Sequence, residues 1–155
     1  MTKLQTGDVA PGFELLDGEG NPWSLDDLKG KKVILYFYPA DDTPGCTVEA
    51  CDFRDTQTQW GQSGYVVLGV SPQGPDSHRR FSEKYELNFP LLVDADRSVA
   101  QAYGAADDSG GMFKGKALRV KRATFVIDEE GRITEALYGV RGKGHVDQLR
   151  EILGV

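Results

Sequence analysis

Val33-Ile-Leu-Tyr-Phe-Tyr38 is an unbroken apolar and aromatic run, and Pro39-Ala-Asp-Asp-Thr43-Pro-Gly-Cys46 follows it directly. Such a run predicts a strand that is buried on both faces in the middle of a sheet. The proline would end the strand, and the acidic loop leads to Thr43 and Pro44. A side-chain oxygen followed by a proline ring is typical of a helix start. We therefore expect a strand, a loop and a helix in which Cys46 is the third residue.

Cys46 is a candidate nucleophile because of this position. The third residue of a helix lies among free backbone N–H groups at the positive end of the helix dipole, which favours a negative side chain. The thiolate is the nucleophilic form of cysteine, so this environment would activate Cys46. Gly45 has no side chain and would let a small substrate approach. The alternative is a small buried residue that happens to open a helix.

The second cysteine, Cys51, lies five residues after Cys46. Five helical residues rise about 7.5 Å and turn by about 500°. The two Cα atoms would then be roughly 8 to 9 Å apart, beyond the limit of about 7 Å for a disulfide. The spacing matches neither a Cys-x-x-Cys redox motif nor a zinc half-site. It suggests a nucleophile and a resolving thiol that meet only after the helix unwinds locally.

Length and composition indicate one globular domain, residues 1–155, with 39% hydrophobic and 27% charged residues. The net charge of −6 disfavours binding to nucleic acid or to an anionic membrane. The sequence contains no run long and apolar enough to span a bilayer and no secretory segment, so we expect a cytoplasmic protein. Two cysteines in a reducing compartment are more often transient and catalytic than structural.

Strands and helices alternate in the first part of the chain, and a hairpin followed by a helix ends it. This order predicts a thioredoxin-like α/β sandwich, in which ligands bind beyond the carboxyl ends of the parallel strands, where the Cys46 loop would lie. Residues 104–115 are expected to form a flexible surface loop. Besides the central strand, we expect strands at 13–16, 65–70, 90–93, 119–128 and 132–138, and helices at 24–28, 44–61, 76–85, 98–103 and 145–153.

Other polar residues carry weaker signals. His78 and His145 are far apart in sequence and lack ligand-type spacing, so solvated or capping roles are expected. Asp41 and Asp42 are expected to be solvated turn residues. The acidic segment from residue 94 lacks the glycine and the final glutamate of a calcium loop, and we reject a metal site there.

Arg122 alternates with apolar residues along one face of its predicted strand. A charged side chain there is costly unless it is paired with an anion. An edge position, at which Arg122 reaches water, is the equally good alternative. The residues alone do not separate the two.

The motif Pro39-x-x-x-Thr43-x-x-Cys46 resembles the active-site motif of the peroxiredoxins. The longer segment 36–55 is similar to the bacterioferritin-comigratory, or peroxiredoxin Q, subfamily, and the similarity covers nearly the whole chain. This resemblance implies the peroxiredoxin form of the thioredoxin-like fold, a three-layer sandwich with a central mixed β-sheet flanked by helices.

The resemblance also implies a role for each residue of the motif. Cys46 would be the peroxidatic cysteine, Cys51 the resolving cysteine, Thr43 a hydroxyl partner of sulfur and peroxide, Pro39 a shield for the sulfur, and Arg122 the cation that holds the thiolate. The implied activity is an atypical 2-Cys thiol peroxidase that reduces hydrogen peroxide and organic hydroperoxides without a cofactor. A thioredoxin-like dithiol would recycle it, and the protein would be a monomer.

Two other functions remain open at this point. A thiol–disulfide oxidoreductase acting on proteins would be expected to carry Cys-x-x-Cys, which the sequence lacks. A redox sensor or holdase would expose Phe53 and Trp60 to a partner when the helix unwinds, with little turnover.

Overall fold

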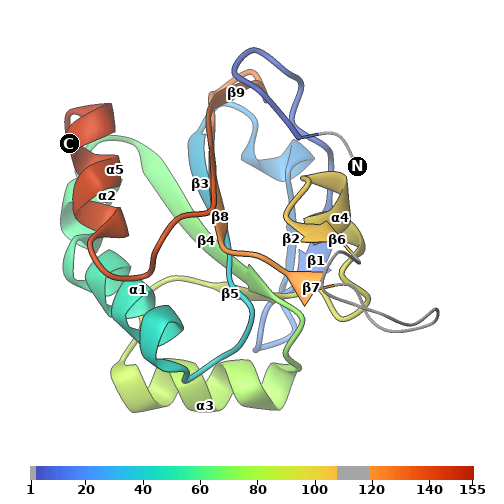
Figure 1. The fold of residues 1–155 in the computed structure, drawn as a ribbon, viewed down its shortest axis with the longest axis vertical. Coiled ribbons are helices and arrows are strands. Elements are labelled where there is room, and N and C mark those ends of the chain that lie inside the picture. The colour runs from blue at the N-terminus through green and yellow to red at the C-terminus, as the bar shows by residue number, and fades with distance from the viewer. Residues whose placement is uncertain (1–2, 108–118) are drawn as a thin grey trace.

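The computed structural model describes residues 3–107 and 119–155, and Figure 1 shows its central sheet edge-on between two outer layers. The longest helix in the described residues is the one that carries both cysteines. The helical elements are η1 (Asp26–Leu28), α1 (Pro44–Asp55), α2 (Gln57–Gln62), α3 (Pro75–Tyr85), α4 (Ser98–Ala102) and α5 (His145–Leu153).

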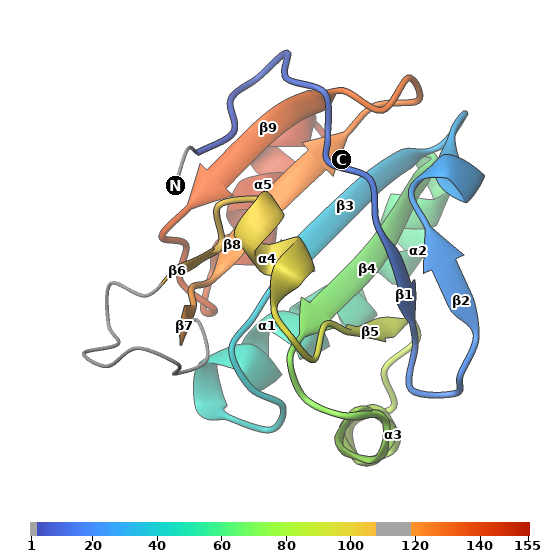
Figure 2. The ribbon, with the colours of Figure 1, turned by 90° about the vertical axis from the view of Figure 1, so that its right-hand side faces the viewer.

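The central sheet is mixed and has the strand order β5-β4-β3-β8-β9. Its middle strand β3 pairs in parallel with β4 and antiparallel with β8, as Figure 2 shows from in front of the sheet. The residues of β3 from Val33 onward are fully buried, which confirms the predicted central strand. The five strands are β3 (Lys32–Phe37), β4 (Tyr65–Ser71), β5 (Leu91–Val93), β8 (Ala123–Ile127) and β9 (Ile133–Tyr138).

Alternation along β3 divides the core into two halves, because successive side chains point to opposite faces. Ile34, Tyr36 and Tyr38 pack with α1, α2 and α5, where Phe53 and Trp60 are fully buried. These aromatic rings lie 4.7 to 6.3 Å apart between centroids along the pairs Tyr36–Phe53 and Phe53–Trp60. This half of the core fixes α1 against the sheet.

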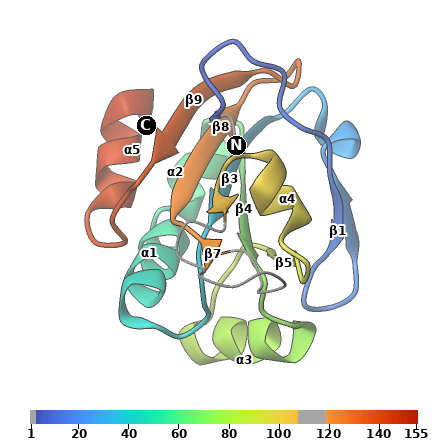
Figure 3. The same ribbon diagram turned by 45° about the vertical axis from the view of Figure 1, so that its right-hand side comes forward.

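The opposite face of β3 carries Val33, Leu35 and Phe37, which pack against α4 and the N-terminal segment. A small hairpin lies on this side, made of β1 (Glu14–Leu16) and β2 (Pro22–Ser24). A second two-stranded sheet pairs β6 (Ala106–Asp107) with β7 (Arg119–Val120). Figure 3 shows the layers side by side, with α3 crossing the end of the sheet near the start of α1.

The expected helix over residues 44–61 is wrong in one respect, because it is broken at Thr56. The Thr56 hydroxyl donates to the Asp52 carbonyl at 2.8 Å and accepts the Trp60 indole N–H at 2.9 Å. Hydroxyl bonding to the carbonyl four residues earlier bends helices. The break gives α2 its own direction and lets Trp60 enter the core.

Other boundaries deviate less from expectation. Ser24 belongs to β2, and its Oγ accepts the Asp27 N–H at 3.2 Å ahead of the single turn η1. The expected flexible loop 104–115 begins instead with β6, and its remainder lies outside the described residues. Asp94, in the segment rejected as a calcium loop, accepts hydrogen bonds from the backbone N–H groups of Val99 and Ala100 in α4.

No helix in the described ranges is long and apolar enough to cross a bilayer.

Candidate active site

The loop after β3 delivers Cys46 to the first turn of α1 in the predicted register. Thr43 is the N-cap residue, with extended backbone angles, and Pro44 is the first helical residue, so Cys46 is the third. We expected the Thr43 hydroxyl to cap the helix, but it makes no cap hydrogen bond. It donates instead to the Ala40 carbonyl at 3.0 Å, which closes the loop on itself. The N–H groups of the first turn are therefore left without a side-chain cap from Thr43.

Cys46 is buried, and a cation reaches its sulfur. One guanidinium nitrogen of Arg122, Nη2, donates to Cys46 Sγ at 3.2 Å, from a residue 76 positions away in sequence. Of the two alternatives for Arg122, pairing with an anion is confirmed by its ion pair with Glu49. Burial opposes the charge of Arg122, but Glu49 and Cys46 raise the pKa of the guanidinium, so it stays cationic.

Glu49 is part of the site, although the sequence analysis did not single it out. Its carboxylate oxygen Oε1 accepts a hydrogen bond from Arg122 Nη1 at 2.7 Å, and its side chain is fully buried. Oε2 has no hydrogen-bond partner within the described part of the chain. Burial raises the pKa of Glu49 to about 7, with Arg122 acting in the opposite direction. Its place three residues after Cys46, on the same helix face, was the available signal.

The arginine thus bridges two buried groups of α1, the sulfur of Cys46 and the carboxylate of Glu49. A planar guanidinium presents several N–H groups in a fixed fork, so it can hold both at once. Its positive charge therefore lies directly against the sulfur of Cys46. This arrangement places a buried sulfur beside a cation at the end of the sheet where ligands bind in α/β folds.

Two glycines let the chain close tightly around this site. A Cβ atom on Gly45 would lie 3.0 Å from Arg122 Nη2, and a Cβ atom on Gly142 would collide with the Gly45 carbonyl group. The segment between β9 and α5 therefore packs directly on the first turn of α1. Both contacts depend on the missing side chain.

We expect Gly142→Ala to lower both stability and peroxide reactivity. The obstructing atoms belong to the backbone of Gly45, so the first turn of α1 must move, and overpacking of this kind costs about 1–3 kcal/mol. Thermal unfolding and the rate of Cys46 oxidation would measure the two effects. Gly61→Ala is the matched control, because a Cβ atom there meets open space and should leave both quantities unchanged or slightly raise the melting temperature. An unchanged melting temperature in Gly142→Ala would contradict the expected collision.

The expected solvated or capping role of His145 is wrong, because its side chain is buried and makes no cap hydrogen bond. His145 begins α5, is 2% exposed, and its Nε2 lies 2.8 Å from Thr124 Oγ1 on β8. Burial, and then the charge of Arg122, lower the pKa of His145 to about 4, so the ring is neutral at pH 7. A neutral ring beside Arg122 adds no competing charge to the site.

The expected solvated turn position of Asp41 and the expected solvated or capping role of His78 are also wrong. Their side chains are 3% and 0% exposed, and His78 Nδ1 lies 2.7 Å from Asp41 Oδ2. Asp42 is more exposed, and its carboxylate accepts from Lys84 Nζ at 2.8 Å and from the Tyr85 hydroxyl at 2.7 Å. The acidic loop is therefore fastened to α3, which sequence spacing could not indicate.

The model of the AhpC/TSA family matches residues 6–136. The chain belongs to the AhpC/TSA family. It is 47% identical over 155 residues to a putative peroxiredoxin of Mycobacterium tuberculosis, covering 99% of this chain and 98% of that one. It is 40% identical over 150 residues to peroxiredoxin Bcp of Bacillus subtilis, covering 97% and 95%. The crystal structure of peroxidoxin BcpB from Mycobacterium tuberculosis matches with a TM-score of 0.88 at 35% identity, covering 97% of each chain.

These comparisons confirm the resemblance to the Bcp and peroxiredoxin Q group and the predicted peroxiredoxin fold, a mixed sheet flanked by helices. A peroxiredoxin of this group is a thiol-dependent peroxidase. Its substrates are peroxides, and a thiol serves as its reductant. The predicted roles of the individual site residues stay predictions.

The peroxiredoxin carries both cysteines as free thiols in this structure. Cys46 and Cys51 lie on one continuous helix, α1, and Cys51 is partly exposed. Desolvation raises the pKa of the Cys51 thiol, with Arg54 acting in the opposite direction. Pro39 is exposed where β3 ends, and its role as a shield for the sulfur stays a prediction.

Proposed function

We propose that this peroxiredoxin reduces hydrogen peroxide and organic hydroperoxides at Cys46. The observation that carries the proposal is the Arg122 guanidinium, which contacts the buried Cys46 sulfur and the buried Glu49 carboxylate together. A cation fixed in this way stabilises a thiolate and remains in place to stabilise the charge that develops on the peroxide oxygens. Hydrogen-bond donors that are already in place usually make the largest contribution to stabilising the transition state.

In the proposed first step, the Cys46 thiolate attacks one peroxide oxygen in line with the O–O bond. The S–O bond forms as the O–O bond breaks, and the leaving oxygen takes a proton and departs as water or an alcohol. Arg122 and the backbone N–H groups of the first turn of α1 stabilise the charge on both oxygens, and the Thr43 hydroxyl joins them when it turns away from the Ala40 carbonyl. Cys46 is oxidised to a sulfenic acid, and the peroxide is reduced.

In the proposed second step, the Cys51 thiol condenses with the sulfenic acid. An S–S bond forms, and the sulfenic oxygen leaves as water. Because both cysteines lie on the intact helix α1, the first turns of that helix must unwind before the sulfur atoms can meet. A thioredoxin-like dithiol then reduces the disulfide and is itself oxidised, which returns both cysteines to thiols.

The remaining parts of the proposal concern partners and location. The net charge of −6 supports the absence of nucleic-acid binding. A cytoplasmic location would supply the thiol reductant that the two free cysteines need. We propose a monomer, because the chemistry above needs residues of one chain only, and no cofactor, because sulfur carries both electrons.

The test is a stopped-flow reaction of the reduced protein with stoichiometric hydrogen peroxide, with thiols counted after quenching. We expect rapid loss of both thiols in the wild type and none in Cys46→Ser. Cys51→Ser should react once and then fail to recycle with a thioredoxin-like reductant. The matched variants thus separate the attacking thiol from the resolving thiol.

Contrary outcomes point to the two other functions. Loss of thiols no faster than that of a free cysteine, together with catalytic reduction of insulin disulfides, would favour a thiol–disulfide oxidoreductase. Oxidation that exposes Phe53 and Trp60 to a partner, with poor turnover, would favour a redox sensor.

A further inference from the structure

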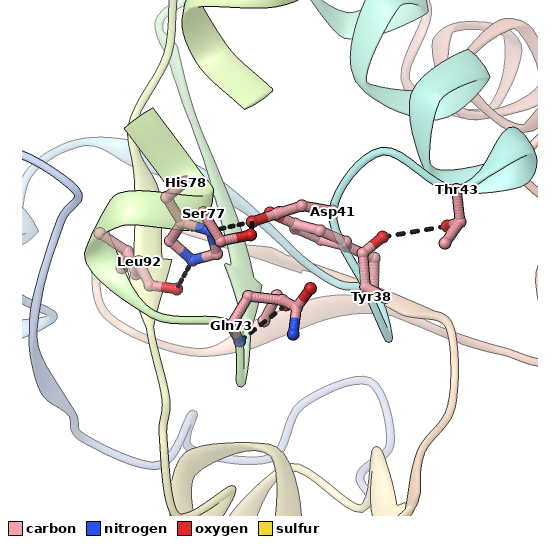
Figure 4. A network of polar contacts seen from close by, with 9 residues as sticks. Tyr38, Asp41, Thr43, Gln73, Ser77, His78 and Leu92 are labelled. Atoms are coloured by element: carbon pink, nitrogen blue, oxygen red, sulfur yellow. Dashed lines mark hydrogen bonds and ion pairs between the residues drawn. The ribbon is translucent and has the colours of Figure 1, made fainter. Parts of the chain in front are cut away.

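The carboxylate of Asp41 accepts hydrogen bonds from two hydroxyls and faces a histidine ring inside the protein. The Tyr38 and Ser77 hydroxyls donate to it at 2.6 and 2.7 Å, and His78 Nδ1 lies 2.7 Å from Oδ2. Figure 4 shows Asp41 between Tyr38 on one side and Ser77 and His78 on the other. The contacts join the end of β3, the loop that leads to Cys46 and the helix α3.

The second ring nitrogen of His78 extends this network to the sheet. Nε2 lies 2.9 Å from the Leu92 carbonyl of β5, and a carbonyl oxygen can only accept, so Nε2 carries the proton. Although burial acts in the opposite direction, the hydrogen bonds from His78 and Tyr38 lower the pKa of Asp41, which is therefore ionised. Both ring nitrogens of His78 thus face oxygen atoms, and the ring is fixed between the Asp41 carboxylate and the sheet.

This buried pair lies close to Thr43 and Cys46 in sequence, and within the described residues no hydrogen bond or ion pair joins it to them. Asp41 precedes Thr43 by two residues and Cys46 by five, and the loop between them is short. Asp42 adopts a left-handed conformation, with φ of 56°, and the Thr43 hydroxyl is bonded back to Ala40. With so few rotatable bonds left, the position of Asp41 sets the path by which the chain enters α1.

Burying a carboxylate costs desolvation energy unless hydrogen bonds replace its lost water. What this hydrogen-bonded network adds is a single defined geometry. In the proposed cycle the first turns of α1 unwind and re-form, so a fixed point is needed immediately before them. Asp41 is held by β3, α3 and β5 and supplies that point.

We infer that Asp41 and His78 are positioning residues for peroxide reduction: their buried pair holds the loop before α1 so that Thr43 and the first helical turn stay aligned with Arg122. This inference rests on the proposed function. It assigns no contact with peroxide to either residue. Both act through the loop, on the geometry around Cys46.

The experiment compares two reactions of Cys46 in Asp41→Asn and His78→Phe. Reduction of hydrogen peroxide needs an in-line attack among aligned donors, whereas alkylation by iodoacetamide needs little beyond an accessible thiolate. Small misplacements can cost about 100-fold in rate, so we expect the peroxide rate constant to fall roughly 10- to 100-fold. The alkylation rate should change far less. Thermal unfolding would confirm that each variant is folded at the assay temperature.

Asp42→Asn is the matched control, because Asn tolerates the left-handed conformation and the exposed pair with Lys84 is worth little. It should keep the wild-type peroxide rate within about 2-fold if the effect belongs to the buried pair. Ser77→Ala removes one donor to Asp41 and is the milder variant. If the other two fail to fold, a smaller loss of peroxide rate in Ser77→Ala supports the inference, and an unchanged rate overturns it.

Two further outcomes would overturn the inference alone. Folded Asp41→Asn with a wild-type peroxide rate constant would show that the pair serves only stability. Equal losses in the peroxide and alkylation reactions would show an effect on the thiolate and not on alignment. If the wild type itself reacts no faster than a free thiol, the proposed function fails and the inference fails with it.

Discussion

Replacing Arg122 with methionine is expected to slow the reaction of Cys46 with hydrogen peroxide by roughly 100- to 1,000-fold, the cost of losing a preorganised donor in a buried site. The guanidinium contacts the Cys46 sulfur at 3.2 Å, and within the described ranges no other cation forms a hydrogen bond with that sulfur. Stopped-flow kinetics at pH 7 would measure the rate constant. Arg122→Lys keeps the charge but cannot reach both Cys46 and Glu49 with one planar group, so it should be intermediate.

The same replacement leaves Glu49 buried without its cationic partner. Arg122 is what lowers the pKa of Glu49 against burial, so without it Glu49 takes up a proton at pH 7, and the loss of stability should stay below the about 3–5 kcal/mol of a buried group that remains charged. In the double variant Arg122→Met with Glu49→Gln, stability at pH 7 should largely return while the peroxide rate stays low. A double variant that recovers both would show that Arg122 acts through folding alone, and would contradict its assignment to the chemistry.

The second large effect concerns how stability depends on pH. The folded-state pKa of Glu49, about 7, lies above its ordinary value of 4.5, so Glu49 contributes stability below pH 4.5 that is lost as the pH rises to 7. The pKa of His145, about 4, lies below its ordinary value of 6.5, so His145 contributes stability above pH 6.5 that is lost as the pH falls to 4. The two dependences oppose each other between pH 4.5 and 6.5.

Each shift corresponds to about 3 kcal/mol, from roughly 1.4 kcal/mol for each pH unit. We expect the stability difference between wild type and Glu49→Gln to fall by about that amount from pH 4.5 to 7. The difference between wild type and His145→Gln should rise by a similar amount from pH 4 to 6.5. Urea unfolding of the reduced protein across this range would give both curves. Parallel curves for wild type and Glu49→Gln would show that Glu49 has an ordinary pKa.

The fold was accessible from the sequence because its strongest signals are local. The continuous apolar run 33–38 is typical of a strand buried on both faces, at the centre of a sheet. The Thr43–Pro44 pair marks the start of a helix. The break at Thr56 was missed because a single hydroxyl bond overrides a continuous apolar stripe.

The sequence by itself determined the central strand, the register that makes Cys46 the third residue of α1, and the five-residue spacing to Cys51. Each depends on neighbours along the chain. Only the tertiary structure decided which polar side chains meet in the interior, because Arg122 and Glu49 come from distant segments, as do His78 and Asp41. A buried charge is stable only with a partner, and a partner far away in sequence leaves no trace in local pattern or spacing.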